Sequence, residues 1–115
     1  MNVISLNEIP FKEKKTLVHN ACALYKKMQL YKKFVTEKRH MNISDVIEDV
    51  NRQTFKSSSL FESLVEMLST DHKMIIQKEF IDETESEWWK EYWSKSTYYK
   101  VMHEAIDNFL FLFYA

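Results

Sequence analysis

The chain has 115 residues, with no glycine, one proline, one cysteine and a net charge of −1. This length suits a single domain. The lack of glycine disfavours phosphate-cradling loops and tight β-hairpins, and the lone cysteine excludes an internal disulfide. The charge is uneven: residues 1–57 carry 11 Lys and Arg against 6 Asp and Glu, whereas residues 58–115 carry 5 against 11. We therefore predict a basic N-terminal helical segment, residues 1–57, and an acidic helical bundle, residues 58–115.

The first predicted element is a long helix over residues 10–39, with Pro10 in its first turn. Its apolar residues recur at alternating steps of four and three, the spacing of a heptad seam. The seam consists of Leu17, Ala21, Leu24, Met28, Tyr31 and Val35. It is interpreted either as intramolecular core or as the contact surface of a homodimer.

Five further helices are predicted over residues 45–55, 60–68, 71–81, 85–93 and 95–113. Each follows a residue that favours an N-cap, namely Ser44, Ser59, Thr70, Thr84 and Ser94. The serine-rich stretch Lys56–Ser59 is expected to separate the first two of these helices, and the acidic stretch 82–86 to form a turn. The sequence thus predicts an all-α protein of about six helices.

The segment from Trp88 to Ile106 is the most informative one for function. Two adjacent helices with a sharp start at Ser94 are typical of a helix-turn-helix, whose last helix enters the major groove of DNA. The periodicity places Tyr98, Met102, Ala105, Ile106 and Phe109 toward the core. It leaves Lys95, Ser96, Tyr99, Lys100 and His103 outward, as candidate contacts to phosphates and base edges.

The residues from Leu68 to Leu110 resemble region 4 of bacterial sigma factors and the related phage ArpU-type regulators. The resemblance is carried by Ile75, Ile76 and Phe80, by the Ser-Lys-Ser-Thr-Tyr run at 94–98 and by Ala105. The aromatic version of this motif is also similar to small helical proteins of mollicutes. The resemblance implies a sigma region 4-like helix-turn-helix at the C-terminal end of the bundle. The chain departs from the pattern at positions where the family usually carries Arg or Lys: Val101, His103, Glu104 and Asp107.

Other surface candidates lie outside this motif. The lysines Lys26, Lys27, Lys32 and Lys33 are interpreted either as a solvated helix face or as contacts to the DNA backbone. Trp88 and Trp89 are adjacent, so both cannot face inward on one helix. Trp89 is therefore a candidate for contact with a partner.

The sequence thus favours a DNA-binding transcriptional regulator. The alternative is a protein-interaction module, either a homodimer through the Leu17–Val35 seam or a partner of RNA polymerase or another protein, that has lost autonomous DNA binding. No arrangement of residues signals catalysis, a metal site or a cofactor. No segment has the apolar length of a membrane span, and a cytoplasmic location is expected.

Overall fold

The computed structural model describes residues 8–37 and 45–114, with side chains described for residues 8–34 and 52–114. All regular elements in these residues are helical. They are α1 (Phe11–Glu37), α2 (Asp45–Glu66), α3 (Thr70–Ile75), the π-helical turn η2 (Ile76–Ile81), the 3-10 turn η3 (Trp88–Glu91) and α4 (Lys95–Tyr114). The all-α prediction is confirmed. The predicted number of about six helices is too high, because the described residues contain four α-helices.

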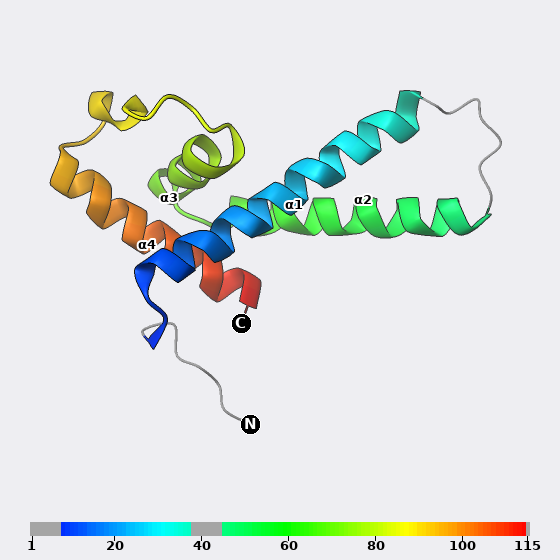
Figure 1. Cartoon of the computed structure of the whole chain (residues 1–115), viewed down its shortest axis with the longest axis horizontal. Helices are drawn as coiled ribbons and strands as arrows, with labels where there is room; N and C mark the ends of the chain where they lie inside the picture. Colours follow the sequence, from blue (N-terminus) through cyan, green and yellow to red (C-terminus); the bar gives the residue numbers. More distant parts are fainter. Residues whose placement is uncertain (1–7, 38–44, 115) are drawn as a thin grey trace.

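Helices α1 and α2 form an antiparallel hairpin that extends away from the other elements (Figure 1). Helix α4 crosses α1 near the N-terminal end of α1. Polar side chains of α1 and α2 form hydrogen bonds with each other. Gln29 Nε2 donates to Ser58 Oγ at 2.7 Å and to Glu62 Oε1 at 2.9 Å. The radius of gyration is 16.9 Å, whereas a compact chain of this length would have about 13 Å. The hairpin therefore gives the molecule an elongated shape.

The predicted break at Lys56–Ser59 is wrong, because α2 continues through it. Ser58 is fully buried, and its hydroxyl accepts hydrogen bonds from Gln29 and Lys32 of α1. The small serine allows the two helices to approach closely, so its contacts across the hairpin outweigh its weak preference for ending a helix. The predicted division between residues 57 and 58 consequently falls within α2.

The core lies where α1, the C-terminal half of α2, α3, η2 and α4 meet. The five inward residues predicted for α4 are all buried, which confirms its predicted orientation. From α1, Val18 and Cys22 are fully buried, whereas the seam residue Leu24 is 59% exposed. The buried stripe of α1 is thus rotated away from the predicted seam. Val35 and Ser44 lie outside the residues whose side chains are described.

The helix predicted over 71–81 is present but changes its winding halfway. It begins at Thr70, with Ser69 rather than Thr70 as the N-cap, and its second half is the π-helical turn η2. In this turn, the Asp82 N–H donates to the carbonyl of Gln77, five residues earlier, at 2.7 Å. The next residue, Glu83, has φ of 50°, a left-handed conformation that glycine adopts most easily.

The helix predicted over 85–93 is wrong, because only the single 3-10 turn η3 forms there. Its aromatic side chains are held by other elements: Trp88 Nε1 donates to Glu79 of η2, and the Trp89 ring stacks on Tyr98 of α4. These tertiary contacts fix the chain in a shape that a regular helix would not allow. None of the helices within residues 8–37 and 45–114 is long and apolar enough to span a membrane.

Candidate nucleic-acid interface

The start of α4 is fixed by Ser94, as the sequence predicts. The Ser94 Oγ accepts the backbone N–H of Thr97 at 3.3 Å and lies 3.0 Å from the Thr97 hydroxyl. The backbone carbonyl of Ser94 accepts the Tyr98 N–H at 2.8 Å, which closes the first helical turn. These contacts satisfy part of the hydrogen-bonding capacity that a helix N-terminus leaves open.

Glu79 connects the start of α4 to η2 and η3. Its carboxylate accepts the indole N–H of Trp88 at 2.8 Å and also the phenol O–H of Tyr98. The Tyr98 ring is stacked on Trp89, with the ring centroids 4.6 Å apart. Burial, together with the hydrogen bond to Glu79, raises the pKa of the Tyr98 phenol far above its ordinary value. The phenol therefore remains a hydrogen-bond donor at neutral pH, and the first turns of α4 are held firmly in place.

The residues predicted to contact nucleic acid lie on the exposed part of the first three turns of α4. Tyr99 is 50% exposed, and the other four side chains are also exposed, namely Lys95, Ser96, Lys100 and His103. Of these five, His103 has the clearest contact with another element. Its ring stacks on Phe11 of α1, with centroids 3.7 Å apart. The structure thus brings the predicted residues together at one end of α4.

The acidic residues farther along α4 contact basic residues of other helices. The Asp107 carboxylate lies 2.8 Å from the ammonium of Lys14, a side chain that is only 11% exposed. The Glu104 carboxylate lies 3.5 Å from His72 Nε2. These two carboxylates depart from the basic pattern of the resembled family, and in this fold they help to hold α1 and α3 against α4.

Two exposed lysines that the sequence analysis did not select, Lys12 and Lys15, lie on the first turns of α1. The contacts of Phe11 and Lys14 place this end of α1 against the third and fourth turns of α4. Lys12 and Lys15 line a cavity of about 300 Å³ together with Glu79, whose carboxylate positions α4. No sequence pattern distinguishes these two lysines from the others of α1, and only the fold shows that this end of α1 lies near α4.

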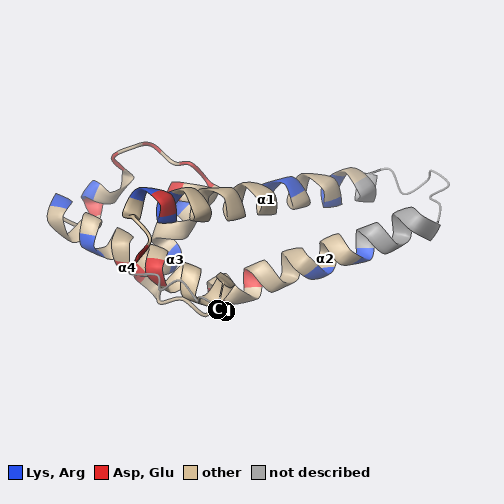
Figure 2. Ribbon diagram, turned by 60° about the horizontal axis from the view of Figure 1, so that its bottom comes forward, with Lys and Arg blue, Asp and Glu red and all other residues tan. Residues whose placement is uncertain are grey.

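The lysines that were predicted as backbone contacts lie farther along α1, on the hairpin. Lys26 forms an ion pair with Glu83 at 3.2 Å, and the Lys32 ammonium lies 4.7 Å from the centroid of the Phe55 ring. Lys27 and Lys33 are exposed. Figure 2 shows these basic positions along α1, apart from those at the start of α4. These four lysines therefore lie on a different part of the surface from the candidate interface at the start of α4.

Trp89, the predicted partner contact, is partly buried, and its indole N–H donates to the carbonyl of Ser86 at 3.2 Å. Because its ring stacks on Tyr98, Trp89 helps to hold the start of α4 in place. The neighbouring Trp88 is 9% exposed and belongs to the core. The two tryptophans thus differ in burial, as their adjacency predicted.

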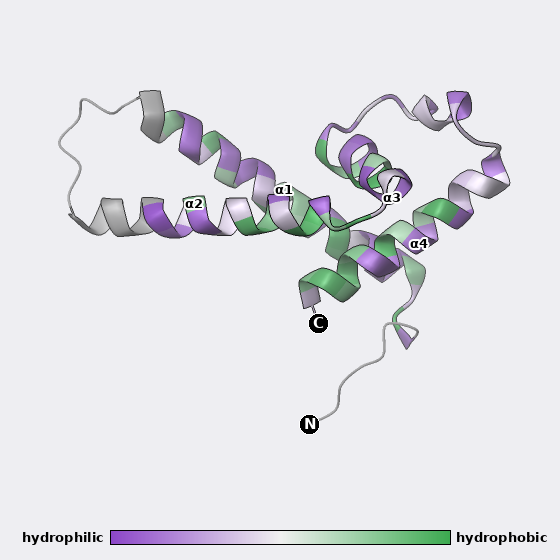
Figure 3. Cartoon of the chain, turned by 180° about the vertical axis from the view of Figure 1, so that it is seen from behind, coloured by the Kyte–Doolittle hydropathy of each residue, from purple (hydrophilic) through white to green (hydrophobic). Residues whose placement is uncertain are grey.

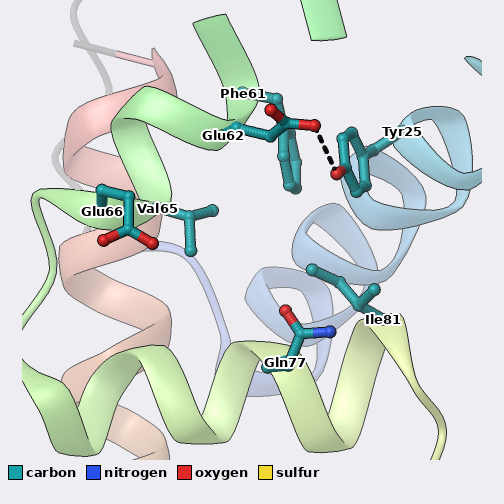
Figure 4. Close-up of a pocket in the computed structure, with 7 residues that line it drawn as sticks. All are labelled: Tyr25, Phe61, Glu62, Val65, Glu66, Gln77 and Ile81. Carbon is teal, nitrogen blue, oxygen red and sulfur yellow. Dashed lines mark hydrogen bonds between the residues drawn. The ribbon is translucent and has the colours of Figure 1, made fainter. Parts of the chain in front are cut away.

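A separate cavity of about 140 Å³ lies between α1, α2 and η2 (Figure 4). Its polar wall includes Tyr25, whose hydroxyl donates to Glu62 Oε1 at 2.8 Å. Burial and this hydrogen bond raise the pKa of Tyr25 to about 12. The cavity is smaller than the roughly 300–1,000 Å³ of typical small-molecule sites. We interpret it as a gap in the packing of the hairpin on η2.

The described residues offer no cluster of three or more His, Cys, Asp or Glu that could hold a metal ion. Cys22 is fully buried, and burial raises the pKa of its thiol to about 12. A thiol with such a pKa is almost entirely protonated at neutral pH and is a poor nucleophile. This cysteine therefore acts as a small apolar core residue.

No protein-family model, curated protein or solved structure matches the chain.

Proposed function

We propose that the protein is a transcriptional regulator that binds double-stranded DNA through the first three turns of α4. The observation that carries the proposal is the grouping of Lys95, Ser96, Tyr99 and Lys100 at an exposed helix start. In helix-turn-helix proteins the N-terminal residues of the last helix contact the base edges. We propose the same role for α4, although the 3-10 turn η3 stands where a helix-turn-helix would have its preceding helix. The cap at Ser94 and the Glu79 contacts support the proposal, because they hold this helix start in one position.

We include Lys12 and Lys15 in the proposed surface, because they lie on the first turns of α1, where Phe11 stacks on His103 of α4. In the proposed complex they contact phosphates beside the groove that receives α4, while Ser96 and Tyr99 face the bases. For the lysines of the hairpin we favour the other sequence-based interpretation, a solvated helix face, over contact with the DNA backbone. The proposed function is binding, with no catalytic step.

The test is a pair of charge-reversal variants with the same change in net charge. We expect Lys95→Glu with Lys100→Glu to weaken binding to an AT-rich duplex at least about 100-fold, because two phosphate contacts become repulsive. Binding is measured by fluorescence anisotropy at low salt. The control is Lys27→Glu with Lys33→Glu on the hairpin, which we expect to change affinity by less than about threefold.

Equal losses in the two double variants would contradict the proposed surface, because they would show that only the net charge matters. Circular dichroism of both variants checks that the helices are retained. All the substituted side chains are exposed, so neither change removes a core contact.

A second candidate function is that of a protein-interaction module. It is favoured by large apolar side chains that remain exposed, among them Leu30 and Met67, which are 69% and 68% exposed. Apolar contacts persist in salt that removes phosphate contacts. A defined protein partner, such as RNA polymerase, that stays bound at high salt would favour this function, while loss of all binding at high salt would favour DNA.

A further inference from the structure

One titratable group of the candidate interface, His103, lies where α1 meets α4. Its ring stacks on the ring of Phe11, with the centroids 3.7 Å apart and an angle of 23° between the ring planes. The His103 side chain is nevertheless exposed. This half of α4 is also more hydrophilic than the C-terminal end of the helix (Figure 3). The imidazole is therefore held in place and still open to a ligand that approaches the start of α4.

Two carboxylates of α4 are close to His103 along the helix, and both have partners on other helices. Asp107, one turn farther along, lies 2.8 Å from the ammonium of Lys14 in α1. Glu104, the next residue, lies 3.5 Å from His72 Nε2 in α3. The acidic groups of α4 thus hold its neighbouring helices, whereas the imidazole of His103 contacts an aromatic ring.

Basic residues outnumber acidic ones on the two helix segments that meet at His103. Residues 11–15 of α1 carry three lysines and one glutamate, Glu13, and residues 95–103 of α4 carry two lysines and no carboxylate. Tyr99 and Lys100 are one turn before His103 on α4. Except for Lys14, these lysines are the ones proposed to contact DNA phosphates. A phosphate bound among them places negative charge near the imidazole, and negative charge favours the protonated ring.

We propose that His103 takes up a proton from solvent when DNA binds, so that the affinity for DNA rises as the pH falls. The inference rests on the proposed function and adds a form of regulation to the same site. Histidine is the side chain whose charge ordinarily changes between pH 5 and 8. Both N–H groups of the protonated ring lie in the ring plane. Because His103 stacks on the face of Phe11, these groups are directed past that ring, where a phosphate oxygen can accept them.

Two other histidines of the described residues provide comparisons. The side chain of His72 is only 13% exposed, and both of its ring nitrogens contact side chains of α4. His19 is exposed and lines the cavity that also includes Lys12 and Lys15. It is two turns, or roughly 12 Å, beyond Phe11 along α1. His103 is thus the histidine that lies at the contact between the two parts of the proposed surface.

The experiment measures the affinity of the full chain for an AT-rich duplex at about pH 8 and about pH 5.5, at the same ionic strength. We expect the wild type to bind at least about fivefold more tightly at the lower pH, because the protonated ring adds one phosphate contact. The dependence of the logarithm of affinity on the logarithm of salt concentration should become steeper by about 1. His103→Gln should bind like the wild type at the higher pH and gain much less at the lower pH.

His19→Gln and His72→Gln are the matched controls, and both should keep the pH dependence of the wild type. His103→Lys carries its charge at both pH values and should bind about equally at both. An equal gain in affinity for His103→Gln and the wild type would overturn this inference and leave DNA binding intact. Loss of the gain in His19→Gln would also overturn it, because the proton would then be taken up on α1. A wild type that binds no DNA at either pH would overturn the proposed function and this inference with it.

Discussion

At the residue scale, the lack of glycine forces other residues into positions where glycine would be expected. Glu83 ends η2 in a left-handed conformation with φ of 50°. The backbone N–H of the next residue, Thr84, donates to the carbonyl of Lys78 at 2.9 Å, which closes the end of this turn. A non-glycine residue in this conformation costs roughly 1 kcal/mol, because its Cβ approaches the backbone carbonyl.

We therefore predict that Glu83→Gly raises the free energy of unfolding by about 0.5–1 kcal/mol. The substitution also removes the ion pair with Lys26, which is partly exposed and contributes at most about 1 kcal/mol. For this reason Glu83→Gly is made in a protein that already carries Lys26→Gln and so lacks the ion pair. The stability of this double variant is compared with that of Lys26→Gln alone. Urea unfolding measures each difference. A lower stability of the Glu83→Gly, Lys26→Gln protein than of Lys26→Gln would contradict the strained conformation.

A second residue-scale prediction concerns the Tyr98 hydroxyl. Tyr98→Phe removes one of the two donors to Glu79, and we expect it to lower the free energy of unfolding by about 1–3 kcal/mol. We also expect it to weaken DNA binding, because the start of α4 loses a tie to η2. Tyr99→Phe, one residue along and half exposed, is the matched control for stability. Equal stabilities of the two variants would show that the contact with Glu79 contributes little.

At the element scale, the features that could be predicted from the sequence are those that depend on periodicity and on local capping. The inward face of α4 follows from apolar spacing over many turns, and its start follows from Ser94. Both are found in the structure. The break at Lys56–Ser59 was predicted from local preference alone. It fails because the buried Ser58 hydroxyl accepts a hydrogen bond from the partly buried Gln29, which lies 29 residues away in the sequence.

The prediction of a helix over residues 85–93, around η3, is wrong for a related reason. Trp88 and Trp89 are fixed by Glu79 and Tyr98, and single-sequence periodicity does not indicate such partners. The same limit explains why the sequence analysis did not select Lys12 and Lys15. Lys12 and Lys15 lie near α4 only because Phe11 stacks on His103 and Lys14 pairs with Asp107. Candidate residues within one helix could be predicted, whereas those brought together from two helices could not.

At the scale of the whole molecule, the two ends of α4 differ in character. The N-terminal end is a basic, polar helix start, whereas apolar side chains of α1, α2 and α4 gather at the C-terminal end. A dimer would present two such helix starts to DNA. Helix-turn-helix dimers bind half-sites about 34 Å apart, one turn of the duplex. Dimerisation would then raise the affinity for paired half-sites through the local concentration of the second α4.

The central claim is that the start of α4 and the first turns of α1 contact DNA phosphates. The most direct test is the dependence of the DNA association constant on salt for the wild-type chain. If Lys12, Lys15, Lys95 and Lys100 each contact one phosphate, the logarithm of the constant should fall with the logarithm of salt concentration with a slope of about −3 to −4 per chain. Changing Lys12 and Lys15 to Gln should reduce the slope by about 2. Absence of binding at low salt, or a slope that these changes leave unaltered, would contradict the account.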